Sequence, residues 1–134
     1  MKKDIYRRTN TTVSLLNYHL VFCPRYRRKI FDTPGVEEYF KLLVEDICAK
    51  HDIQILAMEC HHDHVHMFVS TLPTLSPADV MRYIKGATSH EIRQKFPKFA
   101  AMPTLWTRSY FVSTAGNVSS ETIKRYVETQ KTRP

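Results

Sequence analysis

The stretch IQILAMECHHDHVHMFVS at residues 53–70 decides the fold of this chain. It contains two strand-like runs, 53–60 and 64–70, which are joined by three polar residues at 61–63. This spacing predicts a tight β-hairpin, because short polar connections between β-rich runs are typical of paired antiparallel strands. The hairpin would supply two neighbouring strands of an antiparallel sheet.

The second strand of this hairpin carries two histidines one residue apart, His64 and His66. Alternate residues of a strand share a face at roughly 7 Å, close enough for two imidazoles to chelate one divalent ion. Val65, Met67 and Val69 would then point to the opposite, core side. Paired histidines also occur as adventitious metal binders or as partly exposed structural residues, so the pair alone leaves both interpretations open.

Segments on both sides of the hairpin complete a sheet with helices. The predicted elements are a strand at 13–23, a helix from Val36 to near His51, a helix beginning at Ser76 and Pro77, a strand at 109–114 and a helix at about 119–131. The order strand, helix, strand, strand, helix, strand, helix predicts an α+β fold, a ferredoxin-like or RRM-like antiparallel sheet (βαββαβ) with an added C-terminal helix. Both crossover helices would cover one face, so the histidines would lie on the open face.

The predicted C-terminal helix carries Tyr126 and Gln130, which are four residues apart and therefore share one face. A phenol oxygen and an amide oxygen from this face could approach the same ion as the two histidines. Because tyrosine ionises near pH 10 in solution, Tyr126 would be a nucleophile only with a metal ion and cations beside it. Tyr126 also belongs to an apolar stripe, where a tyrosine more often packs than reacts.

Length and charge limit the kind of partner. The 134 residues form one predicted domain, 1–134, with no room for a second catalytic domain. Lys and Arg number 20 against 13 Asp and Glu, and the formal net charge of +7 favours a polyanionic partner without separating DNA from RNA or a membrane surface. The run Arg25–Lys29, with Tyr26 among its cations, suits a single strand through stacking and charge, although such runs are usually solvated surface.

The three cysteines, Cys23, Cys48 and Cys60, are widely spaced and form no C-x-x-C pair. We interpret them as small buried residues with reduced thiols, which predicts a cytoplasmic protein. Cys60 together with His64 and His66 could alternatively bind zinc, although that set lacks a fourth ligand nearby. The chain shows no signal peptide and no apolar run of the length that a membrane span needs, so no membrane association is expected.

Five co-linear segments are more specific than any histidine pair. They are YHLVFCPRYRRKIF at 18–31, DHVHMFV at 63–69, IKGATS at 84–89, LWTRSYFVSTAGNVS at 105–119 and IKRYVETQ at 123–130. In this order they resemble the HUH-type single-tyrosine transposases of the insertion-sequence 200/605 group, which move a mobile element as single-stranded DNA. The resemblance spans nearly the whole chain.

This resemblance implies a metal-dependent transposase that cleaves and rejoins single-stranded DNA at insertion-sequence ends through a covalent 5′-phosphotyrosine intermediate, after recognising subterminal hairpins. It implies that His64 and His66 bind the metal, that Gln130 is the third protein ligand and that Tyr126 is the nucleophile. The implied cofactor is Mg²⁺ or Mn²⁺. The resemblance also implies a homodimer in which the tyrosine helix of one subunit can complete the histidine site of the other.

The same resemblance indicates which surface cations could bind DNA, and it reveals one residue that departs from the family pattern. Candidates for contacts to the DNA backbone are Arg25, Arg27, Arg28, Lys29 and Lys85. The departure is His62, which stands where the family commonly has proline. Its side chain could point to the same face as His64 and bring a third imidazole near the metal.

Two other classes of protein stay open. A noncatalytic nucleic-acid-binding module could use the same RRM-like sheet, but we expect its usual stacking aromatics on the central strands to be missing, since histidines occupy positions 64 and 66. A replication or relaxase nickase would share the chemistry, but such enzymes normally carry additional domains. Manganese-dependent cleavage would separate an enzyme from a binding module.

Overall fold

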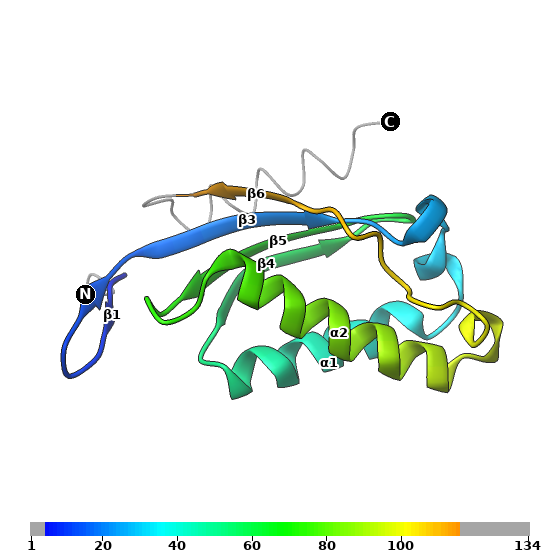
Figure 1. Cartoon of the computed structure of the whole chain (residues 1–134), viewed down its shortest axis with the longest axis horizontal. Helices are drawn as coiled ribbons and strands as arrows, with labels where there is room; N and C mark the ends of the chain where they lie inside the picture. The colour runs from blue at the N-terminus through cyan, green and yellow to red at the C-terminus, as the bar shows by residue number, and fades with distance from the viewer. Residues whose placement is uncertain (1–4, 116–134) are drawn as a thin grey trace.

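A four-stranded antiparallel sheet with two helices on one face forms the body of the molecule (Figure 1). The computed structural model describes residues 5–115. The sheet contains β3 (Leu16–Phe22), β4 (Gln54–Cys60), β5 (Val65–Thr71) and β6 (Phe111–Thr114), and the helices are α1 (Val36–Lys50) and α2 (Pro77–Lys95). Short 3-10 turns lie at Arg25–Arg27, Ile30–Asp32 and Pro97–Phe99.

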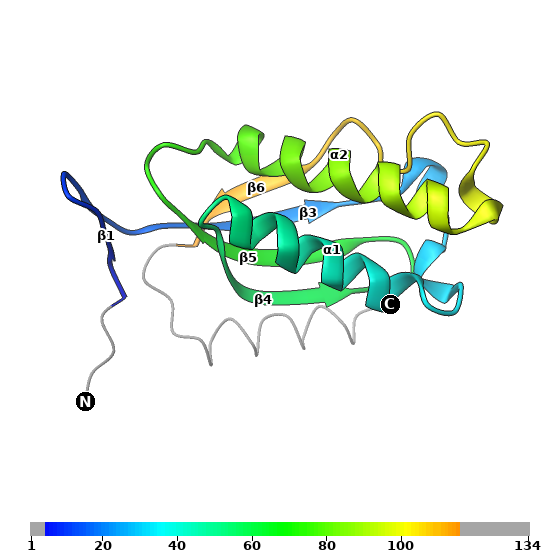
Figure 2. The same ribbon diagram turned by 90° about the horizontal axis from the view of Figure 1, so that it is seen from below.

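The strands lie in the order β4-β5-β3-β6, and all neighbours are antiparallel. α1 connects β3 to β4 and α2 connects β5 to β6, and both helices cover the same face of the sheet (Figure 2). This is the ferredoxin-like arrangement that the sequence predicts. The predicted helix at 119–131 lies outside the described residues.

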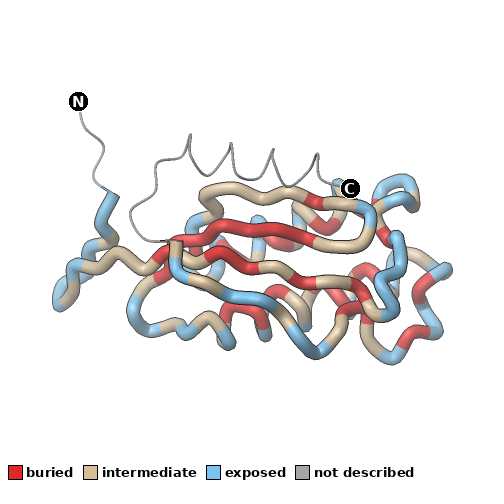
Figure 3. Tube along the Cα trace, turned by 90° about the horizontal axis from the view of Figure 1, so that it is seen from above, coloured by how far each residue is buried: buried red, intermediate tan, exposed pale blue. Residues whose placement is uncertain are grey.

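Alternation along the strands separates a core face from an open face. Leu20 on β3 and the predicted core residues Val65, Met67 and Val69 on β5 are all 0% exposed and belong to one cluster with the apolar positions of both helices. Among the strands of the sheet, the two central ones, β3 and β5, contain most of the buried residues (Figure 3). On β5 the residues of the open face, among them His66, are buried as well.

Local signals fix where the two helices begin. α1 follows Gly35, whose φ of +88° is a conformation that residues with a side chain rarely adopt. α2 begins at the predicted cap, where the Ser76 hydroxyl accepts from the N–H of Asp79 and the Asp79 carboxylate accepts from the N–H of Ser76, both at 3.1 Å. Within residues 5–115, neither helix has the length and apolar character that crossing a membrane requires.

Trp106 joins segments that are far apart in the sequence. Its side chain is buried and packs edge-on against Phe22, with ring centroids 4.9 Å apart. Its indole N–H donates to the Thr88 hydroxyl at 2.9 Å, and the N–H of Leu105 donates to the Ser89 hydroxyl at 2.9 Å. Residues of α2 therefore fasten the irregular segment before β6 to the helix layer.

A small hairpin that the sequence did not predict precedes the sheet. β1 (Arg7–Arg8) pairs with β2 (Val13–Ser14). The guanidinium of Arg7 donates to the carbonyl of Ser70 at 3.0 Å and to the carbonyl of Asp52 at 2.7 Å, which fastens this hairpin to the main sheet. The first predicted strand is thereby divided between two sheets.

Candidate metal centre

The connection between β4 and β5 brings three imidazoles together on the open face of the sheet. His61, His64 and His66 each place one ring nitrogen within 4.8 Å of the others. The rings of the predicted pair, His64 and His66, have centroids 5.0 Å apart. Neutral nitrogen donors in such a cluster have the chemistry that a divalent transition-metal ion requires.

The third imidazole comes from His61, whereas the sequence pointed to His62. The N–H of His61 donates to the carbonyl of His64 at 2.8 Å, so these two residues face each other across a turn formed by His62 and Asp63. His62 is exposed and contacts the Asp32 carboxylate instead. The prediction missed His61 because it gave the turn three residues, and a slip of one residue moves a side chain to the other face of a strand.

A fourth histidine, His19 on β3, lies behind His66. Nε2 of His19 is 3.2 Å from Nδ1 of His66, so that the Nε2 atom of His66 is left for a metal ion. Burial lowers the pKa of both rings, that of His66 to about 4 with the neighbouring imidazoles contributing. His66 is therefore neutral near pH 7, which is the form that binds metals. His19 also stacks on Phe68 with centroids 4.5 Å apart.

Sequence reasoning missed His19, although strand alternation is a signal for it. Leu20 points to the core, so the preceding residue, His19, lies on the open face of β3, where it is paired with Phe68 of β5. Phe111 of β6 contacts the same imidazole edge-on, with centroids 5.7 Å apart, and is 54% exposed. Contrary to the expectation that the central strands lack aromatic side chains on this face, the central strand β5 carries Phe68 there, although that ring is buried, and the edge strand β6 adds the exposed Phe111.

Asp63 connects the histidine cluster to the neighbouring cations. Its Oδ1 is 2.9 Å from Nδ1 of His64, and its Oδ2 accepts from Nε of Arg27 at 3.2 Å. The hydrogen bond with His64 is the main reason that the pKa of Asp63 lies below its ordinary value, and Arg27 lowers it further. An ionised carboxylate on Nδ1 orients the ring and leaves Nε2 for a metal ion, a common arrangement around protein metal sites.

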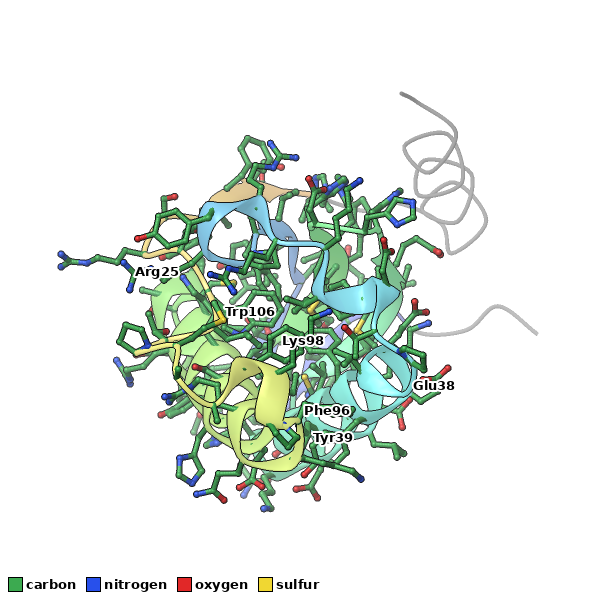
Figure 4. The ribbon with its side chains drawn as sticks, turned by 90° about the vertical axis from the view of Figure 1, so that its right-hand side faces the viewer. Arg25, Glu38, Tyr39, Phe96, Lys98 and Trp106 are labelled. Atoms are coloured by element: carbon green, nitrogen blue, oxygen red, sulfur yellow. The ribbon has the colours of Figure 1, made fainter. Side chains whose placement is uncertain are left out.

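The basic loop, which we define as Arg25–Lys29, projects from the end of β3. Tyr26 and Arg27 have φ angles of +57° and +51°, a conformation that is uncommon for residues with a side chain, and both residues are exposed. Tyr26 is 77% exposed, and the Arg25 guanidinium lies 5.4 Å from its ring centroid. Figure 4 shows Arg25 at the periphery, whereas Trp106 lies in the interior. The loop therefore presents cations and one aromatic ring to solvent.

Lys85 takes a different position from the other candidate DNA contacts. Its ammonium donates to the carbonyl of Thr107 at 2.5 Å and to that of Arg108 at 3.3 Å, and burial lowers its pKa. The carbonyl of Leu105, in the same segment, accepts from the N–H of Arg25 at 2.9 Å. Lys85 thus holds the segment against which the basic loop is anchored.

A hollow of about 660 Å³ opens beside the cluster. Its lining includes His61, His64 and Arg27 together with the carboxylates of Asp32, Glu37 and Glu59. Its volume is in the range of small-molecule sites. Its lining offers hydrogen-bond donors and acceptors and contains both positively and negatively charged side chains.

Cys60 does not join the histidine cluster. It forms the last ladder pair with Val65, whose side chain points to the core. Burial raises the pKa of its thiol to about 12, whereas a zinc ligand must be a thiolate. All three cysteines are free thiols. The alternative zinc site of Cys60 with His64 and His66 therefore receives no support from the geometry.

Tyr126 and Gln130 lie outside the described residues. Their predicted roles as nucleophile and third ligand therefore stay predictions, as do the DNA contacts assigned to the basic loop. Within residues 5–115, the structure brings the two predicted histidines together and adds His61 and His19 to them.

Two solved transposase structures have the same fold. A candidate transposase from Deinococcus radiodurans r1 superposes with a TM-score of 0.73 and 25% sequence identity, covering 95% of this chain and 99% of that chain. A REP-associated tyrosine transposase bound to a REP hairpin superposes with a TM-score of 0.63 and 13% identity, covering 96% of this chain and 69% of that chain. The sheet and its two helices therefore form a transposase fold.

Sequence comparison places the chain within one group of transposases. It is 29% identical over 118 residues to the ISDra2 transposase TnpA of Deinococcus radiodurans, covering 86% of this chain and 84% of that protein. It is 33% identical over 116 residues to the transposase for insertion sequence element IS200 of Salmonella typhimurium, covering 84% of this chain and 75% of that protein. Residues 12–130 match the family described as transposase IS200 like. The chain belongs to this IS200-like transposase family, whose members are DNA-processing enzymes.

Proposed function

We propose that this transposase cleaves and rejoins single-stranded DNA at insertion-sequence ends, with Tyr126 as the nucleophile. His64, His66 and Gln130 hold a divalent metal ion in this proposal. One observation carries it: the imidazole cluster lies directly beside the basic loop, because the Asp63 carboxylate contacts a ring of the cluster and a cation of the loop. A metal-bound phosphate could therefore lie within reach of the cations.

The donor set fits the proposed ion. Two neutral imidazoles and one carboxamide oxygen would leave the full charge of Mg²⁺ or Mn²⁺ available to polarise a phosphate. Asp63 and His19 contact the Nδ1 atoms of the two rings and so fix their orientation. Of the two ions, Mn²⁺ accepts imidazole more readily.

The reaction exchanges one phosphate ester for another. The phenol oxygen of Tyr126 loses its proton and attacks phosphorus, and the bond from phosphorus to the 3′ oxygen of the sugar breaks. The products are a 5′-phosphotyrosine ester and a DNA strand whose 3′ oxygen has taken up a proton. Because the new ester is about as energetic as the old one, a 3′-hydroxyl can reverse the step without ATP. Cleavage and rejoining then use the same residue.

The basic loop supplies the proposed contacts to the DNA. Arg25, Arg27, Arg28 and Lys29 would bind phosphates. Exposed Tyr26 is suited to stack on a base of a single strand. The hollow beside His64 has room for a nucleotide next to the cleaved bond. Since the ammonium of Lys85 contacts two backbone carbonyls, we assign it to holding the loop in place rather than to binding a phosphate.

Hairpin recognition and dimer formation complete the proposal. The REP-associated tyrosine transposase with the same fold was solved bound to a REP hairpin, which supports recognition of a DNA hairpin by this chain. The active form would be a homodimer in which the tyrosine helix of one subunit completes the histidine site of the other. Gly116 and Asn117, which lie outside the described residues, stand where that exchange would need a joint.

Replacement of the nucleophile tests the reaction. Tyr126→Phe should still bind a hairpin-bearing oligonucleotide in a mobility-shift assay, but it should form no denaturation-resistant adduct with that DNA. The matched control is Tyr26→Phe, which removes the hydroxyl of the exposed tyrosine beside the cluster and should leave the adduct intact.

Other outcomes of this experiment have definite meanings. An undiminished adduct with Tyr126→Phe would exclude Tyr126 as the nucleophile, and loss of the adduct with Tyr26→Phe would transfer the role to Tyr26. Binding of DNA without adduct formation by the unaltered protein in Mn²⁺ would favour the noncatalytic binding module.

A further inference from the structure

His61 occupies a place that the proposed ligand set does not use. It is the residue directly after β4, and its backbone N–H is bonded to the carbonyl of His64. Cys60 points to the core, so the next residue along the extended chain points to the opposite face, which is the face of His66. Hairpin geometry, and not chance contact, therefore aims the His61 side chain at the metal centre.

The three rings form a compact group with two orientations. The rings of His61 and His64 are stacked, with centroids 4.3 Å apart and planes 9° apart. The ring of His66 is 5.4 Å from that of His61 and is inclined to it by 72°. One nitrogen of each ring lies within 4.8 Å of the others. An ion that binds imidazole at about 2.1 Å needs ligand nitrogens roughly 3 to 3.5 Å apart with the lone pair of each ring directed at it, so metal binding would rotate the rings of His61 and His64 out of their stacked arrangement.

The neighbouring His62 points away from the cluster that His61 joins. It is one residue away, yet its ring points out of the cluster to the Asp32 carboxylate and is 74% exposed. In contrast, the Nε2 atom of His61 is shielded from solvent. Of the two adjacent histidines in the turn region, only His61 is directed at His64 and His66.

We propose that His61 is an additional protein ligand and that this transposase binds its metal ion through three imidazoles. The inference rests on the proposed function only in taking His64 and His66 as metal ligands. Each nitrogen ligand makes a site less suitable for Mg²⁺, which prefers oxygen, and more suitable for Mn²⁺, Co²⁺ or Zn²⁺. The three-imidazole site therefore selects Mn²⁺ and later transition-metal ions over Mg²⁺.

Metal binding by the full-length protein without DNA tests this inference. The metal-free protein is titrated with Mn²⁺ in calorimetry, and the variants His61→Asn, His62→Asn and His64→Asn are compared with it. Loss of the hydrogen-bonded partner of a ligand typically weakens metal binding by roughly 10- to 100-fold, and His61→Asn should weaken Mn²⁺ binding at least as much. His62→Asn is the matched control and should bind Mn²⁺ as the unaltered protein does.

A spectroscopic count of ligands is independent of any variant. Electron spin-echo spectra of the Mn²⁺-bound protein should contain couplings from three histidine nitrogens, and those of His61→Asn from two. Only two couplings in the unaltered protein, no Mn²⁺ binding at all, or unchanged affinity in His61→Asn would overturn the inference. These outcomes are separate from the adduct assay: a protein that binds Mn²⁺ through His61 but forms no adduct would contradict the proposed reaction alone.

Discussion

Replacement of Asp63 by asparagine should weaken metal binding without unfolding the protein. Its carboxylate accepts from Arg27 at 3.2 Å and lies 2.9 Å from Nδ1 of His64. Asparagine has one acceptor oxygen and no charge, so it cannot serve both partners, and the His64 ring loses its orienting anion. Loss of such a partner costs roughly 10- to 100-fold in metal affinity. This range corresponds to about 1.4 to 2.7 kcal/mol.

The effect on folding should be much smaller. The side chains of Arg27 and Asp63 are 64% and 26% exposed, and ion pairs in such positions typically contribute about 0 to 1 kcal/mol. Mn²⁺ titration calorimetry measures the first effect, and urea unfolding in the presence of a chelator measures the second. The two measurements thus distinguish a residue that orients a ligand from one that holds the fold together.

Asp32→Asn is the matched control for this experiment. Asp32 lines the same hollow and contacts His62, but that histidine lies outside the cluster. Its replacement should leave Mn²⁺ affinity unchanged. Equal Mn²⁺ affinity in Asp63→Asn and Asp32→Asn would refute the view that the Asp63 carboxylate orients a metal ligand.

Two further predictions concern stability. Thr88→Val leaves the buried indole N–H of Trp106 without its acceptor and should lower the free energy of unfolding by about 1 to 3 kcal/mol in urea titrations. Thr88→Ser keeps the acceptor hydroxyl and should therefore lower the free energy of unfolding much less. The pKa of His66 is about 4 in the folded protein and 6.5 ordinarily, so the unfolded chain binds more protons between these values. The metal-free protein should therefore lose stability as the pH falls from about 6.5 to about 4, by roughly 3 kcal/mol from this group, and His66→Gln should show a shallower loss.

The fold could be predicted because its signals are local and periodic. Strand alternation identified the core residues of β5, and Ser76 with Pro77 identified the start of α2. The order of the elements then left few topologies, and the ferredoxin-like one is confirmed. The hairpin of β1 and β2 escaped prediction because strands of two residues are too short to show a period.

The surroundings of the candidate metal centre could be predicted only in part. The pair His64 and His66 follows from alternation along one strand. His61, in contrast, depends on whether the turn contains two residues or three, which composition does not settle. The role of Lys85 depends on the path of the irregular segment that ends before β6, and no periodic pattern reveals that path.

The two histidines of the predicted pair are oriented from different parts of the fold. His66 is contacted by the neutral ring of His19 on β3, in the buried centre of the sheet. His64 is contacted by the Asp63 carboxylate, which in turn holds Arg27 of the exposed basic loop. In the proposed function, a phosphate that takes the Nε–H of Arg27 would displace Asp63 from it and so change the charge facing His64, whereas the contact between His19 and His66 would stay as it is. DNA binding and metal binding would then be coupled through His64, because its partner Asp63 is the one that reaches a surface cation.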